Sequence, residues 1–149
     1  KDPSKPLRVE DIPLTQPATG AFTLEAKDAD IVGTNAHFEQ SKNCIGYWTS
    51  DKDKVRWQIR TRAAKSCRVE LTYACDPKSA GAEVDIILGT TAHRVTIAPT
   101  KSWNDFVTIT LPDIALPAGD WPLEVRPVTK PGDGVMNLRS ITLTPVEPR

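Results

Sequence analysis

Strict alternation of apolar and polar side chains between residues 67 and 75 is the feature that most constrains the fold of this chain. Val69, Leu71 and Tyr73 fall on one face of this segment. The other face carries polar residues: Arg68, Glu70 and Thr72. A period of two is that of a β-strand with one buried face, and such a face needs a second layer to cover it. The segment therefore predicts a sheet that packs on another layer.

Similar segments recur along the chain, separated by turn sequences such as DPKSAG, LPAGDW and TKPGDG. About eight strands are predicted, at 21–32, 54–61, 67–75, 82–88, 93–98, 106–111, 123–126 and 136–144. Residues 34–44 are polar without a sustained period and are predicted to form a loop. Thirteen prolines and the lack of a long helix-period run argue against helices. We therefore expect an all-β fold, an antiparallel β-sandwich of jelly-roll type.

A chain of 149 residues fits a single domain. The first 20 residues contain four prolines and end in Thr-Gly, so we predict a linker or an extended N-terminal segment for 1–20. The sandwich is then expected to occupy 21–149. The 19 basic and 19 acidic side chains cancel, and no run approaches the about 20 apolar residues that span a bilayer. Neither nucleic acid nor a membrane is an expected partner.

Three cysteines leave the disulfide pattern open. Cys67 and Cys75 would lie about 27 Å apart on one strand at about 3.4 Å per residue, which is too far for a bond between them. Cys44 could pair with either if its loop lies over one end of that strand. The favoured interpretation is that all three are buried thiols that act as small apolar residues.

The sequence offers little catalytic chemistry. His37 and His93 are far apart in the chain without metal-ligand neighbours, and no GxSxG motif is present. Four carboxylates near one another could serve glycoside hydrolysis, but a solvated face explains them better: Glu25, Asp28, Asp30 and Glu39. We therefore do not expect an enzyme, and a small hydrolase is kept only as a distant alternative.

Two tryptophans, Trp48 and Trp103, lie in the polar segments NCIGYWTSD and APTKSWND. No apolar alternation requires an indole there, and indole faces stack well on the apolar face of a sugar ring. The alternative is that these indoles, with Tyr47, plug one open end of the sandwich. Trp57 falls in an alternating run and is predicted to be core, whereas Trp121 is undecided.

Six segments in order, FTLEAKDADIVG, NCIGYWTSDKDKVRWQI, VELTYAC, SWNDF, LPAGDWPLEVRP and VMNLRSITLTP, together resemble one family. The chain resembles, over about 21–145, the galactose-binding-like β-sandwich of carbohydrate-binding modules in families six and thirty-five, and especially the modules appended to bacterial secreted sulfatases and fucosidases. In those families the ligand lies at loops on one edge of the sandwich. The resemblance thus implies a ligand site with Tyr47 or Trp48, Trp103 and Asn137, and with Lys101 and Asn43 as supporting residues.

The families commonly hold a structural calcium between acidic residues of the first and last strands. Here that position would offer Glu25 and Asp28, but Lys27 and Arg139 stand where further acidic ligands belong. We therefore predict no calcium and no other cofactor, and a salt bridge from Glu25 to Arg139 or Lys27 in place of the ion. A calcium-dependent rise in melting temperature would contradict this.

The resemblance implies a non-catalytic module that binds a polysaccharide or oligosaccharide and targets an attached glycan-active enzyme, such as a sulfatase or a fucosidase. The expected setting is a secreted or periplasmic bacterial protein, and the module is expected to be a monomer. The alternative is a structural or protein-docking domain of a secreted multidomain enzyme. The sugar is not specified by the sequence, although Lys101 and Lys42 would suit an anionic glycan.

Overall fold

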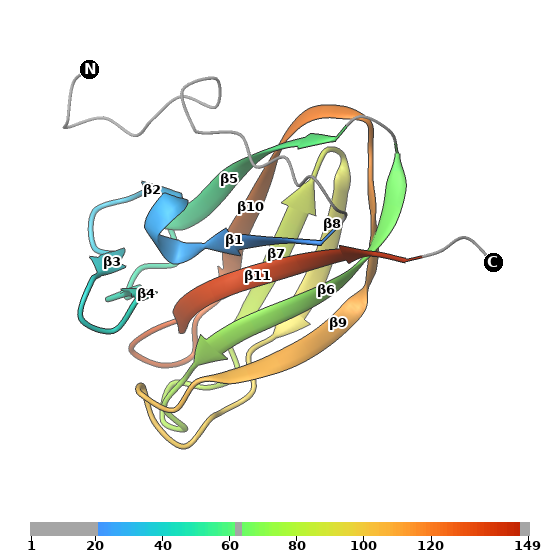
Figure 1. Ribbon diagram of the computed structural model, residues 1–149. Helices are drawn as coiled ribbons and strands as arrows, with labels where there is room; N and C mark the ends of the chain where they lie inside the picture. Colours follow the sequence, from blue (N-terminus) through green and yellow to red (C-terminus); the bar gives the residue numbers. More distant parts are fainter. Residues whose placement is uncertain (1–20, 62–63, 147–149) are drawn as a thin grey trace.

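The computed structural model describes residues 21–61 and 64–146, and its two antiparallel sheets lie face to face as a sandwich (Figure 1). The linker predicted for 1–20 lies outside the described residues. The five-stranded sheet has the order β2-β5-β10-β7-β8. Its strands are β2 (Asp30–Val32), β5 (Lys54–Thr61), β7 (Glu83–Leu88), β8 (Thr91–Thr96) and β10 (Gly119–Thr129). The predicted all-β sandwich is confirmed.

The six-stranded sheet has the order β3-β4-β11-β6-β9, with β1 also paired to β11. Its strands are β1 (Phe22–Glu25), β3 (His37–Glu39), β4 (Cys44–Gly46), β6 (Lys65–Ala74), β9 (Val107–Leu116) and β11 (Asn137–Pro145). A short 3-10 turn, η2 (Ala26–Asp28), follows β1. Because β6 occupies one edge of β11 along its whole length, β4 and β1 share the other edge, with β4 at its start and β1 further along. This arrangement places the short pair β3 and β4 beside the first residues of β11.

The alternating segment that suggested the fold supplies the core. Val69, Leu71 and Tyr73 of β6 are each at most 1% exposed, and they belong to one buried cluster with the inward residues of the five-stranded sheet. Trp57, predicted to be core, is 2% exposed, and its indole N–H donates to the Glu25 carbonyl. Full burial of side chains of this size contributes about 1.5–3 kcal/mol each, so this layer accounts for much of the stability.

The described part of the chain contains eleven strands rather than about eight, and some strands are longer than predicted, so two local predictions are wrong. The segment 34–44 is not a plain loop, because it contains β3 and the start of β4. Strands of three residues are too short to display a period of two. The turn predicted at 116–121 shrinks to 117–118, because β9 ends at Leu116 and β10 begins at Gly119, whose φ of 110° suits a glycine.

All three cysteines are free and buried, so the favoured interpretation of small apolar thiols is confirmed and Cys44 forms no disulfide. Burial raises the pKa of the Cys44 thiol, and likewise that of the Cys75 thiol, to about 11. A raised pKa keeps these groups protonated and unreactive near neutral pH.

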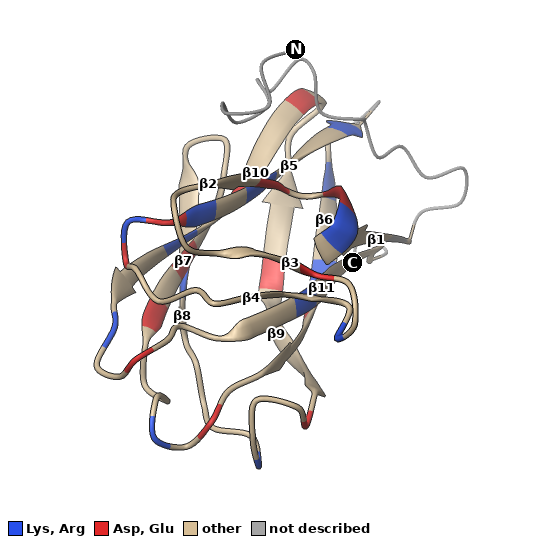
Figure 2. Ribbon diagram, turned by 90° about the vertical axis from the view of Figure 1, so that its left-hand side faces the viewer, with Lys and Arg blue, Asp and Glu red and all other residues tan. Residues whose placement is uncertain are grey.

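Acidic and basic residues are interspersed along the strands and loops of both sheets (Figure 2). On the five-stranded sheet they pair across strands, as in Arg94 Nε to Asp85 Oδ1 at 3.0 Å and Arg60 Nε to Asp120 Oδ1 at 2.8 Å. The hydrogen bond from Arg94 lowers the pKa of Asp85, and that from Arg60 lowers the pKa of Asp120. This outer face is therefore electrically balanced. No helix within 21–61 or 64–146 is long and apolar enough to span a bilayer.

Candidate functional site

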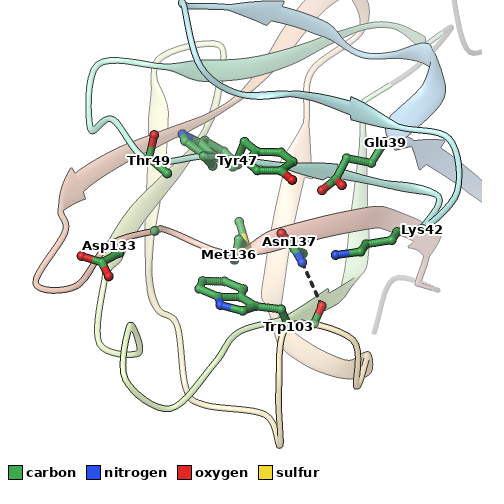
Figure 3. A pocket seen from close by; sticks show the side chains of 10 residues that line it. Glu39, Lys42, Tyr47, Thr49, Trp103, Asp133, Met136 and Asn137 are labelled. Carbon is green, nitrogen blue, oxygen red and sulfur yellow. Dashed lines mark hydrogen bonds between the residues drawn. The ribbon is translucent and has the colours of Figure 1, made fainter.

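Three connections at one end of the sandwich enclose a hollow of about 300 Å³, which we call the aromatic hollow (Figure 3). They are the segment from β3 to the residues after β4, the β8–β9 loop, and the β10–β11 loop with the start of β11. The lining residues are Glu39, Lys42, Tyr47, Trp48, Thr49, Trp103, Asp133, Gly134, Met136 and Asn137. Tyr47 and Trp103 lie on opposite sides of the opening, with Met136 and Asn137 between them (Figure 3).

Tyr47 projects from the chain directly after β4 and is 60% exposed. Its φ of 54° lies in the left-handed region, which costs a residue with a side chain on the order of 1 kcal/mol or more. The amide of Thr49 donates to the Tyr47 carbonyl at 2.9 Å and closes this tight turn. His37 supports the phenol ring from behind, with ring centroids 4.9 Å apart and planes 10° from parallel. Tyr47 thus adopts an unfavourable backbone conformation, and its aromatic ring is exposed to solvent rather than buried.

Trp48 is buried and does not offer an indole face to a ligand. The expectation that its polar flanking residues mark an exposed indole is therefore wrong. Trp48 is 1% exposed, and its indole N–H donates to the Asp53 carbonyl at 3.0 Å. The tight turn at Tyr47 sends that ring outward and the next side chain into the core. Trp48 therefore matches the alternative interpretation, a plug at the end of the sandwich, and forms the inner wall of the hollow.

Asp53 fastens the β2–β3 connection to this region. Its carboxylate, 2% exposed, accepts the backbone N–H groups of Thr34, Asn35 and Ala36 at 3.1, 3.0 and 2.8 Å. Gly33, with φ of 153°, passes so close that a Cβ there would overlap the carboxylate. A buried carboxylate needs hydrogen-bond donors in place of water, and the wrapped loop supplies three of them. The carboxylate and carbonyl of one residue thus fix both the loop before His37 and the indole of Trp48.

Trp103 of the β8–β9 loop is partly exposed and packs along Gly134. A Cβ at Gly134 would lie 3.1 Å from Cη2 of the indole, so the glycine allows this close approach. The side-chain amide of Asn137 donates to the Trp103 carbonyl at 2.8 Å (Figure 3). Asn137 is 6% exposed at the start of β11. It therefore lines the aromatic hollow and holds the backbone of Trp103, whereas its contact with a ligand stays a prediction.

Glu39 and Asn137 approach each other over Gly46 of β4. A Cβ on Gly46 would overlap the Glu39 carboxylate and would lie 3.3 Å from Asn137 Oδ1. Because this position is glycine, the two polar side chains reach the hollow. Lys42 lies at the same end, and Asp133 lies at the opposite end (Figure 3). Two carboxylates and one ammonium group thus line the aromatic hollow, with a formal charge of one negative.

Lys101 and Asn43, predicted as supporting residues, do not line the aromatic hollow. Lys101 is exposed and lines a second hollow with Arg139 on the other side of the β8–β9 loop. Asn43 has φ of 52° in the β3–β4 turn, and its carbonyl accepts a hydrogen bond from Arg139 Nε at 3.3 Å. Its contribution is therefore to the shape of the turn.

Three side chains of the aromatic hollow carried no signal as site residues in the sequence: Thr49, Asp133 and Met136. Glu39 is a candidate in the sequence only as one of four carboxylates for hydrolysis. Glu39 falls in the polar segment 34–44, where the hidden strands β3 and β4 set its direction. Asp133 falls in the turn TKPGDG, where an acidic residue is common for reasons of turn geometry alone. Asp133 becomes a candidate only when the sheet topology places this turn and the Tyr47 turn at the same end of the sandwich.

A cation, Lys27, stands among the residues at which the resemblance would place a calcium ion. The part of the chain that the structure describes contains no cluster of three or more His, Cys, Asp or Glu side chains suited to a metal. Lys27 Nζ lies 3.9 Å from Glu25 Oε2, as one of the two predicted salt bridges requires. Arg139 instead donates to the carbonyls of Lys42 and Asn43, so the alternative bridge to Glu25 is not the one formed. The absence of calcium stays a prediction.

No protein-family model and no curated protein sequence matches the chain. Solved structures do match it. A family 35 carbohydrate-binding module from Clostridium thermocellum matches with a TM-score of 0.70 at 16% identity. The match covers 84% of this chain and 98% of that module. The C-terminal family 6 module of LamC, a marine laminarinase from Zobellia galactanivorans, gives 0.65 at 16% identity, with coverage of 83% of this chain and 98% of that one.

A GH26-CBM35 β-(1,4)-mannanase from Podospora anserina also matches, with a TM-score of 0.69 and 22% identity over 87% of this chain. The match spans only 28% of the mannanase chain. The chain described here therefore has the β-sandwich fold of carbohydrate-binding modules of families 35 and 6, as the resemblance in the sequence predicted.

Proposed function

We propose that this sandwich is a non-catalytic carbohydrate-binding module that holds a sugar ring in the aromatic hollow. The observation that carries the proposal is the pair of rings, Tyr47 and Trp103, held at opposite sides of one opening by loops far apart in the sequence. Aromatic faces contact the apolar C–H surface of a pyranose. Glu39 and Lys42 at one end of the hollow, and the side-chain oxygen of Asn137 between the rings, offer acceptors and donors for its hydroxyls.

The strain at Tyr47 favours a binding role over a structural one. A residue held in the left-handed region and left 60% exposed contributes little to packing. Backbone strain of this kind clusters at functional sites, where the surrounding structure over-determines it. Here the surrounding structure consists of His37 behind the ring and the hydrogen bond from Thr49. Pre-organisation of this ring lowers the conformational entropy lost on binding.

The shape of the hollow suits weak binding of a surface ligand rather than catalysis. It is open and small, and two rings with a few polar contacts support affinities of roughly millimolar to micromolar. The mannanase among the structural neighbours carries its module in a longer enzyme chain, and another neighbour is a family 35 module in complex with a disaccharide that contains glucuronic acid. By analogy, we propose that this module targets an attached glycan-active enzyme to polysaccharide in a secreted or periplasmic setting.

A glycan array with the isolated chain tests the proposal. The panel contains neutral, fucosylated, sulfated and uronic-acid polysaccharides, and the variants are Trp103→Ala and Tyr47→Ala. Trp121→Ala is the matched control, because Trp121 is also partly exposed but packs at the β9–β10 turn by Gly89 and Gly119. We expect binding that survives in the control and is lost in both site variants.

If the unmodified chain binds no glycan on the array, the result would count against a sugar module and in favour of a docking domain. Tryptophan fluorescence separates the two further. Trp103 is the partly exposed indole at the hollow, whereas Trp48 and Trp57 are buried. A bound sugar should therefore change emission in the parent but not in Trp103→Ala.

A further inference from the structure

A second hollow of about 450 Å³ lies beside the aromatic hollow, and we call it the basic hollow. It is lined by Lys101, Asn104, Asp105, Phe106, Val107 and Arg139. We propose that the basic hollow is a second subsite that takes an anionic substituent, carboxylate or sulfate, on the sugar next to the one in the aromatic hollow. The proposal rests on the function proposed above and names its ligand as an acidic polysaccharide.

The two hollows share their walls. The β8–β9 loop contributes Trp103 to the aromatic hollow and the next residues to the basic hollow. On β11, Asn137 lines the first and Arg139 the second, and two residues along a strand advance roughly 6–7 Å. This step is comparable to the length of one sugar residue. A ligand that stacks on Trp103 can therefore reach Arg139 with its neighbouring unit.

Arg139 is directed to this surface by a β-bulge. Leu138 pairs with Tyr73 and Ser140 pairs with Thr72, so Arg139 is the extra residue of β11 in its ladder with β6. Bulges of this kind re-aim a side chain and are frequent next to functional sites. The irregularity in the last strand thus occurs at the one residue that carries a cation into the basic hollow from β11.

The guanidinium group of Arg139 is held rigidly with donors to spare. Its carbon lies 3.6 Å from the centroid of the Phe106 ring, while Nε and Nη2 donate to the carbonyls of Asn43 and Lys42 at 3.3 and 2.9 Å. A guanidinium has five N–H groups, and the described residues provide acceptors for two of them. The remaining N–H groups of the guanidinium are already oriented to bind an oxyanion, since this side chain loses little conformational freedom on forming further hydrogen bonds.

Lys101 supplies the second cation from a fixed backbone. The preceding residue, Thr100, is buried, and its amide donates to the Cys75 carbonyl at 2.9 Å. The acidic residue of the basic hollow, Asp105, is occupied by a hydrogen bond from the Ser102 hydroxyl at 2.6 Å. Two cations and one carboxylate give this hollow a formal charge of one positive.

The opposite charges of the two hollows determine where an anion would bind. The aromatic hollow contains Glu39 and Asp133 against Lys42, so a carboxylate or sulfate there would meet net repulsion. In the basic hollow, Lys101 and Arg139 outweigh Asp105, so the same anion would meet net attraction. An acidic glycan is therefore expected to place an uncharged face between Tyr47 and Trp103 and its anionic group at Arg139 and Lys101.

Nuclear magnetic resonance titration tests the subsite with three small probes: sodium sulfate, methyl α-galacturonide, and the uncharged methyl α-galactoside. Ionic strength is held constant at about 50 mM, where surface charges are weakly screened. We expect saturable shifts of the Arg139 Nε–H and Lys101 amide signals with sulfate, with the galacturonide, or with both, and none with the galactoside. Which anion acts distinguishes a sulfated from a uronic-acid ligand.

Lys101→Gln is the deciding variant, because Lys101 is exposed and Arg139→Gln would also release the β3–β4 turn. Loss of one exposed cation should weaken the apparent affinity for the anion about two- to fivefold. Arg68→Gln is the matched control, an exposed Arg on β6 that does not line the basic hollow. Shifts that never saturate, or that are as large at Arg68 Nε–H as at Arg139, would overturn the proposal.

Failure of the proposed function has a different signature. In that case the indole signal of Trp103 and the ring signals of Tyr47 would stay unchanged across the polysaccharide panel, whatever the anion does at Arg139. Conversely, binding of neutral polysaccharides at Trp103 with no anion response at Arg139 would leave the sugar module intact and remove the second subsite.

Discussion

His37 stacks on Tyr47 with ring centroids 4.9 Å apart, and its Nδ1 lies 2.9 Å from the Asn35 carbonyl. The imidazole therefore links the exposed ring of Tyr47 to a loop that the buried carboxylate of Asp53 fixes in place. Support of this kind sets the orientation of Tyr47 before any ligand arrives. The binding surface is thus built outward from the core, one contact at a time.

The first prediction concerns this support. His37→Ala removes the stacking partner, so the free Tyr47 side chain samples more rotamers than in the unmodified chain. More conformational entropy is then lost on binding, which should weaken sugar affinity about three- to tenfold. His37→Phe should largely restore affinity, because a flat ring remains. Calorimetric titration of the strongest array ligand measures both, and equal affinity of the alanine variant and the parent would contradict a positioning role.

The second prediction concerns Gly134. Its replacement by alanine places a Cβ about 3.1 Å from the Trp103 indole, so the ring must shift outward. We expect weaker binding with only a small change in melting temperature, because the strain falls on a partly exposed side chain. Gly81→Ala, whose Cβ would meet nothing closer than 3.5 Å but whose φ is 103°, separates the effects: it should lower stability while leaving affinity unchanged.

The comparison of Trp48 with Tyr47 shows where sequence reasoning about the site stops. Polarity of the flanking residues pointed to a segment that lines the aromatic hollow, and the alternating strands located the sandwich. Which of two adjacent aromatics faces solvent depends on one backbone angle, the φ of 54° at Tyr47, and no side-chain pattern encodes that angle. Likewise, Glu39 and Asp133 line one hollow only because β3 pairs with β4 and β4 pairs with β11. Long-range pairing decides the site, whereas local period decides the fold.

The third prediction concerns Asp53. Replacement by alanine leaves three backbone N–H groups without their acceptor and opens the contact with Gly33, so the free energy of unfolding should fall by roughly 2–4 kcal/mol. Denaturant titration measures the loss. Asp51→Ala, an exposed aspartate in the same loop, is the control and should change stability by less than about 0.5 kcal/mol. Similar small losses for both variants would show that the wrapped loop contributes little.

The fourth prediction concerns calcium. Lys27 lies 3.9 Å from Glu25, and this ammonium group opposes a divalent cation at the position where the family holds one. We therefore expect that adding calcium to a chelator-treated sample leaves the melting temperature unchanged. Lys27→Asp, which supplies a further carboxylate beside Glu25 and Asp28, should make stability more sensitive to calcium. A calcium-dependent rise in the parent would contradict the prediction.

The last prediction concerns the buried thiols and alkaline pH. Burial raises the pKa of Cys44 and that of Cys75 from 9.0 to about 11, so between these values the folded state binds more protons than the unfolded state. Since stability falls with pH wherever the folded state binds the extra protons, this contribution is fully present below pH 9 and is lost as the pH rises towards about 11. Denaturant titrations across this range should show the decline.

A variant carrying Cys44→Ala and Cys75→Ala is the control for that decline. It should be less stable at neutral pH, because two buried sulfur atoms are removed from a packed core. It should also show a shallower loss of stability between pH 9 and 11, since the groups that titrate differently in the two states are gone. An identical slope in the parent and the variant would assign the alkaline transition to other groups, such as Tyr73, whose pKa burial also raises.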